Sequence, residues 1–217
     1  MAAVSRGILK ELTAEEFANT ITHGFGLALS IIGFIVLVTL AFIRGDAWLT
    51  AGSIVYGLSL ITLYAASTCY HATNCPIRKK RLQIVDHCCI YLLIAGSYTP
   101  FGIVILDGHL NLLILIWTFA AVGILMKLVF HDRFTIVSTL SYLVMGWLGV
   151  FALQPLFDAL GIMPIILAVI GGVAYSLGVI FFAWHRIPHN HAIFHIFVLA
   201  GSIFHYLAVA IYVVPQT

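Results

Sequence analysis

Charged residues are scarce in this sequence. Lysine, arginine, aspartate and glutamate make up 8% of the 217 residues, whereas hydrophobic residues make up 62%. A water-soluble domain carries about a quarter of its residues as charged side chains. The composition therefore excludes an ordinary soluble domain and indicates an integral membrane protein. The formal net charge is only +2, and it gives no reason to propose nucleic acid as a partner.

Cysteines are few as well, and none of them forms a C-x-x-C pair. The four are Cys69, Cys75, Cys88 and Cys89. We expect no disulfide framework in a chain whose fold is set by lipid. These side chains are interpreted as small apolar fillers between helices.

Long apolar runs are what the sequence has in abundance. A helix needs about 20 mostly apolar residues to cross the hydrocarbon layer, and seven stretches with short polar connections meet this requirement: residues 17–43, 49–71, 83–106, 110–129, 135–154, 162–184 and 190–214. Each must be helical, because an unpaired backbone cannot lie in lipid. The prediction is an all-α membrane protein, a seven-transmembrane helix bundle, with a cytoplasmic N-terminal segment at 1–16 and one membrane domain at 17–217.

The lysines and arginines predict the orientation of this bundle. Nine of the ten precede the first span or lie in connections on the same side, and only Arg44 lies on the other side. Cytoplasmic loops carry the excess of these residues. The N-terminus is therefore predicted to be cytoplasmic and the C-terminus to lie outside.

Histidines interrupt the last apolar run. His191 and His195 are four residues apart, so they share one helix face. His71 ends the second span and Asp86 lies in the opening turns of the third, so the predicted topology brings all four to one depth near the cytoplasmic face. Ionisable groups inside a membrane are costly and mark function. Three imidazoles beside a carboxylate are typical of a catalytic zinc site, although imidazole also suits copper, iron and nickel.

Further polar residues share helix faces with this group. Ser67 lies one turn before His71, and the candidates for substrate contact or for support of the ligands are Glu16, Asn19, His23, Ser97, Ser202 and His205. The deeper histidines, His23 and His205, are expected to serve as hydrogen-bond partners between helices. For the residues of the first span, a helix cap with interhelical hydrogen bonds remains the alternative to substrate contact.

Four segments carry a family resemblance. The stretches "EFANTITH" (16–23), "STCYH" (67–71) and "HAIFH" (191–195), together with Asp86, resemble motifs of the progestin and adipoQ receptor family, whose bacterial branch is called haemolysin III. The resemblance covers essentially the whole chain and points to the short bacterial form, a multi-pass protein of the bacterial inner (plasma) membrane. It implies zinc bound by His71, His191 and His195, with Asp86 holding a zinc-bound water and Ser67 nearby.

The same resemblance links the chain to membrane hydrolases that include alkaline ceramidases. We therefore expect a zinc-dependent hydrolase of lipid amides or esters near the cytoplasmic leaflet, with membrane lipids as its partners. A sensor or regulator of membrane lipids with structural zinc remains an alternative. A pore-forming haemolysin is a third, but a pore needs polar residues from side to side, whereas here they cluster at one end.

Overall fold

The computed structural model describes residues 13–215, and the regular structure of these residues is entirely helical. Seven spans among them are long and apolar enough to cross a membrane, which confirms the predicted fold class. The helices are α1 (Ala14–Arg44), α2 (Ala47–Ala72), α3 (Pro76–Val104), α4 (Leu106–Phe130), α5 (Thr135–Trp147), α6 (Leu153–Leu160), α7 (Ile162–Ala183) and α8 (Asn190–Ala208). Short 3-10 helices occupy His131–Phe134 and Leu148–Ala152, and a π-helix occupies Val209–Val213. Most of the predicted N-terminal segment lies outside the described residues.

The first two helices are delimited by residues suited to helix ends. The Thr13 side chain accepts a hydrogen bond from the Glu16 backbone N–H at 3.2 Å and begins α1. Gly45, with φ 76°, ends α1 in the left-handed conformation that glycine adopts without strain. Asp46 then caps α2 by accepting from the Leu49 N–H at 2.9 Å. This tight connection holds α1 and α2 side by side and antiparallel.

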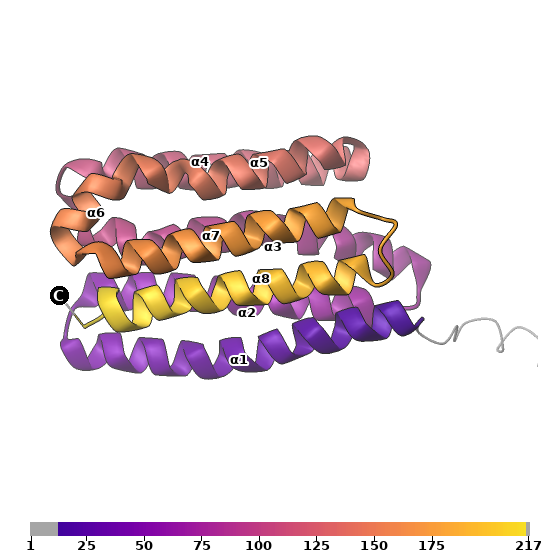
Figure 1. Cartoon of the computed structure of the whole chain (residues 1–217), viewed down its shortest axis with the longest axis horizontal. Coiled ribbons are helices and arrows are strands. Elements are labelled where there is room, and N and C mark those ends of the chain that lie inside the picture. Colours follow the sequence, from indigo (N-terminus) through magenta and orange to yellow (C-terminus); the bar gives the residue numbers. More distant parts are fainter. Residues whose placement is uncertain (1–12, 216–217) are drawn as a thin grey trace, which may run out of the picture.

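The helices run up and down in one bundle, with α1 at one edge and α4 and α5 at the other (Figure 1). Between them, α8 packs against both α1 and α7, while α2 packs against α1 and α3. The last long helix, α8, is therefore a neighbour of the first, α1. We call the end of the bundle where α1 begins and α2 ends the histidine end, because His71, His191 and His195 lie there.

The fifth span differs from the prediction of one helix over 135–154. It extends over Thr135–Leu160 and contains a 3-10 segment between α5 and α6. The phenol oxygen of Tyr98 lies 2.6 Å from the Gly146 carbonyl oxygen and accepts a hydrogen bond from the Gly149 N–H at 2.8 Å. Because a side chain from α3 takes over these backbone groups, the regular α-helical ladder is interrupted there.

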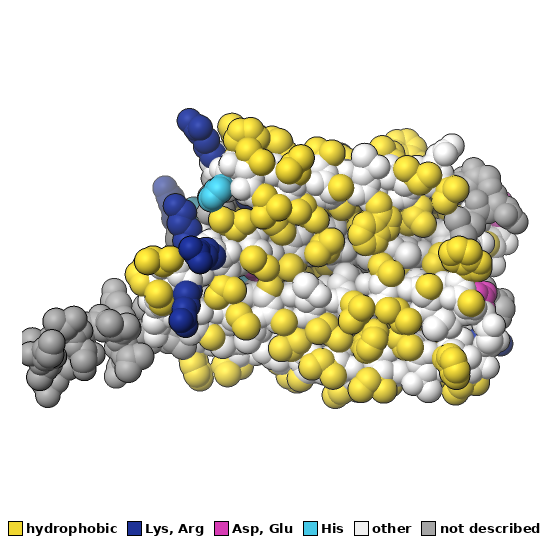
Figure 2. Space-filling view, turned by 180° about the vertical axis from the view of Figure 1, so that it is seen from behind, with side chains coloured by type: hydrophobic (Ala, Val, Ile, Leu, Met, Phe, Trp, Pro, Cys, Tyr) yellow, Lys and Arg dark blue, Asp and Glu magenta, His cyan; other side chains and the backbone are white. Residues whose placement is uncertain are grey.

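The outer surface fits a lipid environment. Hydrophobic side chains cover the long sides of the molecule, and lysine and arginine gather at one end (Figure 2). On α1, for example, Phe25, Ile32 and Ile35 are more than half exposed, whereas Leu37 and Ala41 are fully buried. The apolar exterior and the charged end agree with a bundle that spans a bilayer.

Candidate metal centre

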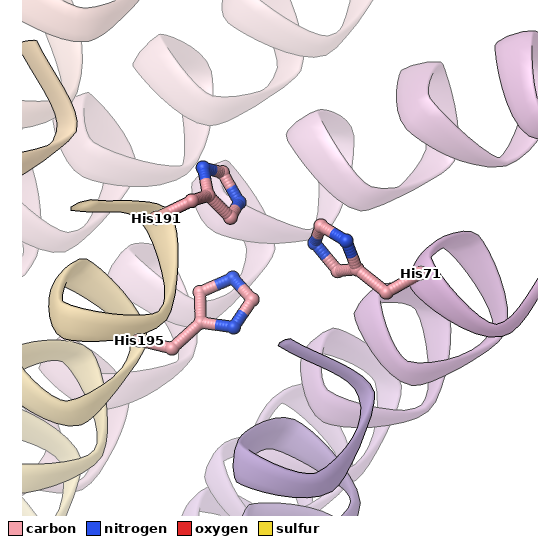
Figure 3. Close-up of side chains that lie close together, drawn as sticks. All are labelled: His71, His191 and His195. Atoms are coloured by element: carbon pink, nitrogen blue, oxygen red, sulfur yellow. The ribbon is translucent and has the colours of Figure 1, made fainter. Parts of the chain in front are cut away.

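Three histidines from two helices face one another at the histidine end (Figure 3). His71 comes from the last turn of α2, and His191 and His195 come from the first turns of α8. One ring nitrogen from each lies within 4.8 Å of the others. The ring centroids are 4.6 Å apart for His191 and His195, and 4.9 and 5.0 Å from His71 to His195 and His191. In a tetrahedral zinc site these nitrogens would be about 3.3 Å apart, so a small approach of the rings completes the geometry.

The chemistry of His71 fits a metal ligand. Its ring is 2% exposed, and its Nε2 has no hydrogen-bond partner among the described residues. Its Nδ1 is 2.6 Å from the Glu16 carboxylate. A buried nitrogen without a partner is costly in a protein interior, and three neutral imidazoles are a donor set that zinc accepts. The residues therefore fit a zinc ion held by His71, His191 and His195, although imidazole alone does not distinguish zinc from copper, iron or nickel.

Two side chains of α1 contact the clustered histidines. The Glu16 carboxylate binds the His71 ring and forms an ion pair with Lys79 at 2.8 Å. The Thr22 hydroxyl lies 3.2 Å from Nδ1 of His195. Such partners orient the rings of metal-binding histidines. Glu16 thus takes part in the cap of α1 through its backbone N–H and bonds His71 of α2 through its carboxylate, which agrees with the expected alternative of a helix cap with interhelical hydrogen bonds.

Within the described residues, His23 does not make the interhelical hydrogen bond expected for it. Its ring stacks on His195 with centroids 3.5 Å apart and planes at 18°, and it meets the Tyr64 ring edge-on at 5.0 Å. The ring nitrogens bond within the ring plane, so a face-on stack leaves them without partners among the described residues. The buried Asn19 Oδ1 also lacks a partner in the described part of the chain. The expectation for His23 was wrong for the described residues, because the ring meets its neighbours His195 and Tyr64 through ring contacts and not through its nitrogens.

Asp86 lies outside the three-histidine cluster but faces the same space. Asp86, Ser67, His191 and His195 line a cavity of about 160 Å³. The Ser67 hydroxyl is the polar neighbour of the Asp86 carboxyl group, although its Oγ makes no hydrogen bond at normal distance. The four groups predicted to reach one depth are thus arranged as three clustered imidazoles with a carboxylate on the cavity wall.

The space beside the metal centre continues along the bundle. A second cavity, of about 220 Å³, shares six lining residues with the first: Ser97, Tyr98, Gly146, Trp147, Gly172 and His205. Apart from these shared residues, the second cavity is lined by apolar residues and glycine, whereas half of the remaining residues that line the first cavity are polar or charged. His205, which was expected to bond another helix, contacts the Ala168 backbone carbonyl of α7. It also lines both cavities, and its Nε2 has no partner among the described residues. Ser202 instead accepts the Tyr64 hydroxyl at 2.8 Å and pairs with Tyr175 at 2.8 Å.

Comparison with known proteins identifies the family. The model of a family described as "Haemolysin-III related" matches residues 12–206. The chain belongs to the haemolysin III family. It is 45% identical over 209 residues to "Hemolysin-3" of Bacillus cereus, covering 95% of both chains. It is 44% identical over 202 residues to the "Hemolysin-3 homolog" of Bacillus subtilis (strain 168), covering 92% of this chain and 95% of that one.

A human protein is similar over the same length. "Monocyte to macrophage differentiation factor" of Homo sapiens is 31% identical over 219 residues, covering 95% of this chain and 88% of the human one. These matches confirm the resemblance that the motifs indicated. Together with the seven spans, the bacterial relatives identify this haemolysin III protein as a multi-pass protein of the bacterial inner membrane.

Sequence reasoning missed three residues around the centre of this haemolysin III protein. Lys79 was interpreted only as part of a basic loop, yet it binds Glu16. Lys127 was assigned to a connection, yet it is 2% exposed and lines the first cavity. Thr22 contacts His195, and its spacing of three residues from Asn19 was a signal that helical periodicity could have given.

Proposed function

We propose that this protein is a zinc-dependent hydrolase of membrane lipids that cleaves an amide or ester bond. The observation that carries the proposal is the juxtaposition of three clustered imidazoles, a carboxylate and a cavity that continues into a second, apolar cavity. A structural metal site needs only the ligands, whereas this one opens through His191 and His195 onto a space large enough for a reacting group. Binding sites for small molecules are mostly apolar with a few placed polar groups.

Each polar group beside the cavity has a role in such a reaction. When bound, zinc would supply Lewis acidity, activating water and polarising the substrate carbonyl. Asp86 would accept the proton of the attacking water at its carboxylate oxygen and return it to the leaving amine or alcohol as the C–N or C–O bond breaks. Ser67 would donate its hydroxyl proton to Asp86 and hold that carboxylate toward the cavity.

The second cavity suggests where the hydrocarbon part of the substrate would lie. It continues from the first between α3, α5, α7 and α8 and is lined mainly by apolar side chains such as Phe101, Leu156 and Val169. An acyl chain in this space would place its carbonyl group toward the histidine end. The apolar lining also speaks against the alternative of a water-filled pore.

The proposal is tested with purified protein and lipids that share one acyl chain but differ in the bond, amide or ester. We expect zinc-loaded wild type to release the fatty acid from at least one of them. We expect Asp86→Asn to keep its zinc and lose about 100-fold or more of this turnover, the usual contribution of a general base. A zinc-loaded wild type that hydrolyses none of these lipids would contradict the proposal.

The same variant separates hydrolysis from a regulatory role with structural zinc. If Asp86→Asn retains zinc and fully restores the phenotype of a deletion strain, cleavage is not the physiological function. If it retains zinc and fails to restore the phenotype, the carboxylate is needed for more than folding. Our proposal places this chemistry at the cytoplasmic leaflet, since the basic residues predict that the histidine end is cytoplasmic.

A further inference from the structure

Two of the three clustered histidines use the same ring nitrogen for a contact with α1. Nδ1 of His71 meets the Glu16 carboxylate at 2.6 Å, and Nδ1 of His195 meets the Thr22 hydroxyl at 3.2 Å. A neutral imidazole carries one proton, on either Nδ1 or Nε2, and the nitrogen without it offers the lone pair that binds a metal. The partner of Nδ1 therefore decides whether Nε2 is available.

Glu16 decides the tautomer of His71. An ionised carboxylate only accepts hydrogen bonds, and Lys79 at 2.8 Å from the other carboxylate oxygen favours the ionised form. Nδ1 of His71 must then carry the proton. Its Nε2, buried and without a partner among the described residues, is left with a lone pair.

Thr22 decides the tautomer of His195 in the same sense. Its hydroxyl proton is directed to the backbone carbonyls of Ala18 at 2.9 Å and Asn19 at 3.0 Å. The oxygen is thus left to accept a proton from His195. This contact requires a proton on Nδ1 of His195 and leaves the lone pair on its Nε2.

We propose that α1 fixes the tautomers of two metal ligands, with Glu16 and Thr22 acting as positioning residues that keep Nε2 of His71 and His195 ready to bind the ion. The inference rests on the metal site of the proposed function, and it does not require hydrolysis. It also explains why the first turns of the otherwise apolar helix α1 carry polar residues. The stack of His23 on His195 further fixes the plane of that ring.

The first test compares metal affinities, measured by competition with a chromophoric chelator on the full-length, metal-free protein. Glu16→Gln keeps the size of the side chain but loses its charge, and we expect Zn²⁺ and Co²⁺ to bind about 10- to 100-fold more weakly. Thr22→Val keeps the shape and loses the acceptor, and we expect affinity to fall about 3- to 10-fold. Thr22→Ser restores the hydroxyl and should restore the affinity.

Matched controls lie on the same helix. Glu15→Gln removes a neighbouring charge, and Thr20→Val removes a hydroxyl whose one hydrogen bond within residues 13–215 is to the Glu16 carbonyl of its own helix. Both should bind metal as wild type does. Lys79→Met breaks the ion pair but leaves the carboxylate on His71, so its effect should be smaller than that of Glu16→Gln. If Lys79→Met weakens binding as much as Glu16→Gln, the ion pair alone explains the effect and the inference is wrong.

A second measurement reads the tautomers without any metal. Nitrogen-15 NMR of histidine-labelled, metal-free protein in detergent distinguishes a protonated Nδ1 from a protonated Nε2. We expect His71 and His195 to carry the proton on Nδ1, and we expect that signal to shift toward the Nε2-protonated form at His71 in Glu16→Gln and at His195 in Thr22→Val. Unchanged signals in these variants would overturn the inference.

The outcomes separate the two proposals. Wild-type protein that binds no metal, yet shows both Nδ1-protonated rings, refutes zinc hydrolysis and leaves the tautomer assignment standing. Wild-type protein that binds and uses zinc, while Glu16→Gln and Thr22→Val bind it with wild-type affinity, refutes the positioning role and leaves the hydrolase standing.

Discussion

At the scale of single residues, several of the buried polar side chains in this apolar chain are held by specific hydrogen-bond partners. His71 is hydrogen-bonded through Nδ1 to Glu16. Ser202 accepts a hydrogen bond from Tyr64 of α2 and is hydrogen-bonded to Tyr175 of α7. In a low-dielectric interior an unpaired polar group costs more than a paired one gains. Removing one partner is therefore a sharper probe than removing both.

Ser202 offers a stability test of this kind. Ser202→Ala leaves the buried Tyr64 hydroxyl and the Tyr175 hydroxyl without their shared partner, so we expect the free energy of unfolding to fall by about 1–3 kcal/mol. Reversible unfolding in mixed micelles measures it. Ser30→Ala is the control, because Ser30 is buried but, in the part of the chain that the structure describes, bonds only to the Gly26 carbonyl of its own helix. Equal stabilities of the two variants would show that the Tyr64–Ser202–Tyr175 contacts contribute nothing measurable.

Residue spacing predicted part of the site and left the rest unresolved. His191 and His195 share a face at any helical spacing, and topology brought His71 to their depth. The role of Lys79 was not predicted, because its contact with Glu16 depends on the turn between α2 and α3. In that turn its ammonium group also lies 3.3 Å from the Tyr70 carbonyl oxygen. Sequence spacing also could not show that His23 would meet a ring face instead of a polar group.

At the scale of helices, length and hydropathy were sufficient to predict the seven spans, because each must cross the same thickness of lipid. The break between α5 and α6 was not predictable from local sequence. It depends on Tyr98 of α3 reaching the Gly146 carbonyl and the Gly149 N–H. The hydrophobic periodicity of a segment indicates which face of its helix is apolar. It does not indicate which side chains of other helices will bond to its backbone.

α1 and α2 pack so closely at Gly26 that adding one methyl group there should disturb their contact. A Cβ at Gly26 would lie 2.6 Å from the Tyr64 ring, whereas one at Gly24 would lie 3.8 Å from its nearest neighbour. Gly26→Ala should push α1 from α2, lower stability by about 1–3 kcal/mol, and weaken metal binding because Glu16 and Thr22 move with the helix. Gly24→Ala should bind metal as wild type does. Wild-type affinity in Gly26→Ala would show that α1 does not govern the centre.

At the scale of the whole molecule, charge is distributed along one axis. Among the described lysines and arginines only Arg44 follows the far end of a span, and the others lie at the histidine end. Figure 2 shows these side chains gathered at one end of an apolar body. Both this polarity and the position of the metal centre follow from the same up-and-down topology.

This asymmetry predicts the orientation in the membrane. A reporter enzyme that is active only outside the cytoplasm should be active when fused after Val214 and inactive when fused in the α7–α8 connection at Arg186. A reporter that is active only in the cytoplasm should give the reverse pattern. If the Arg186 fusion reports an external location, the histidine end faces outward and lipid cleavage at the cytoplasmic leaflet is wrong.

The central claim of this account is that His71, His191 and His195 hold one metal ion. The most direct measurement is the metal content of purified wild type beside His71→Ala, His191→Ala and His195→Ala, with His189→Ala as a control outside the cluster. We predict about one zinc per chain in wild type and in His189→Ala, and a large loss in each of the three ligand variants. Wild type without stoichiometric metal, or ligand variants that retain it, would contradict the account.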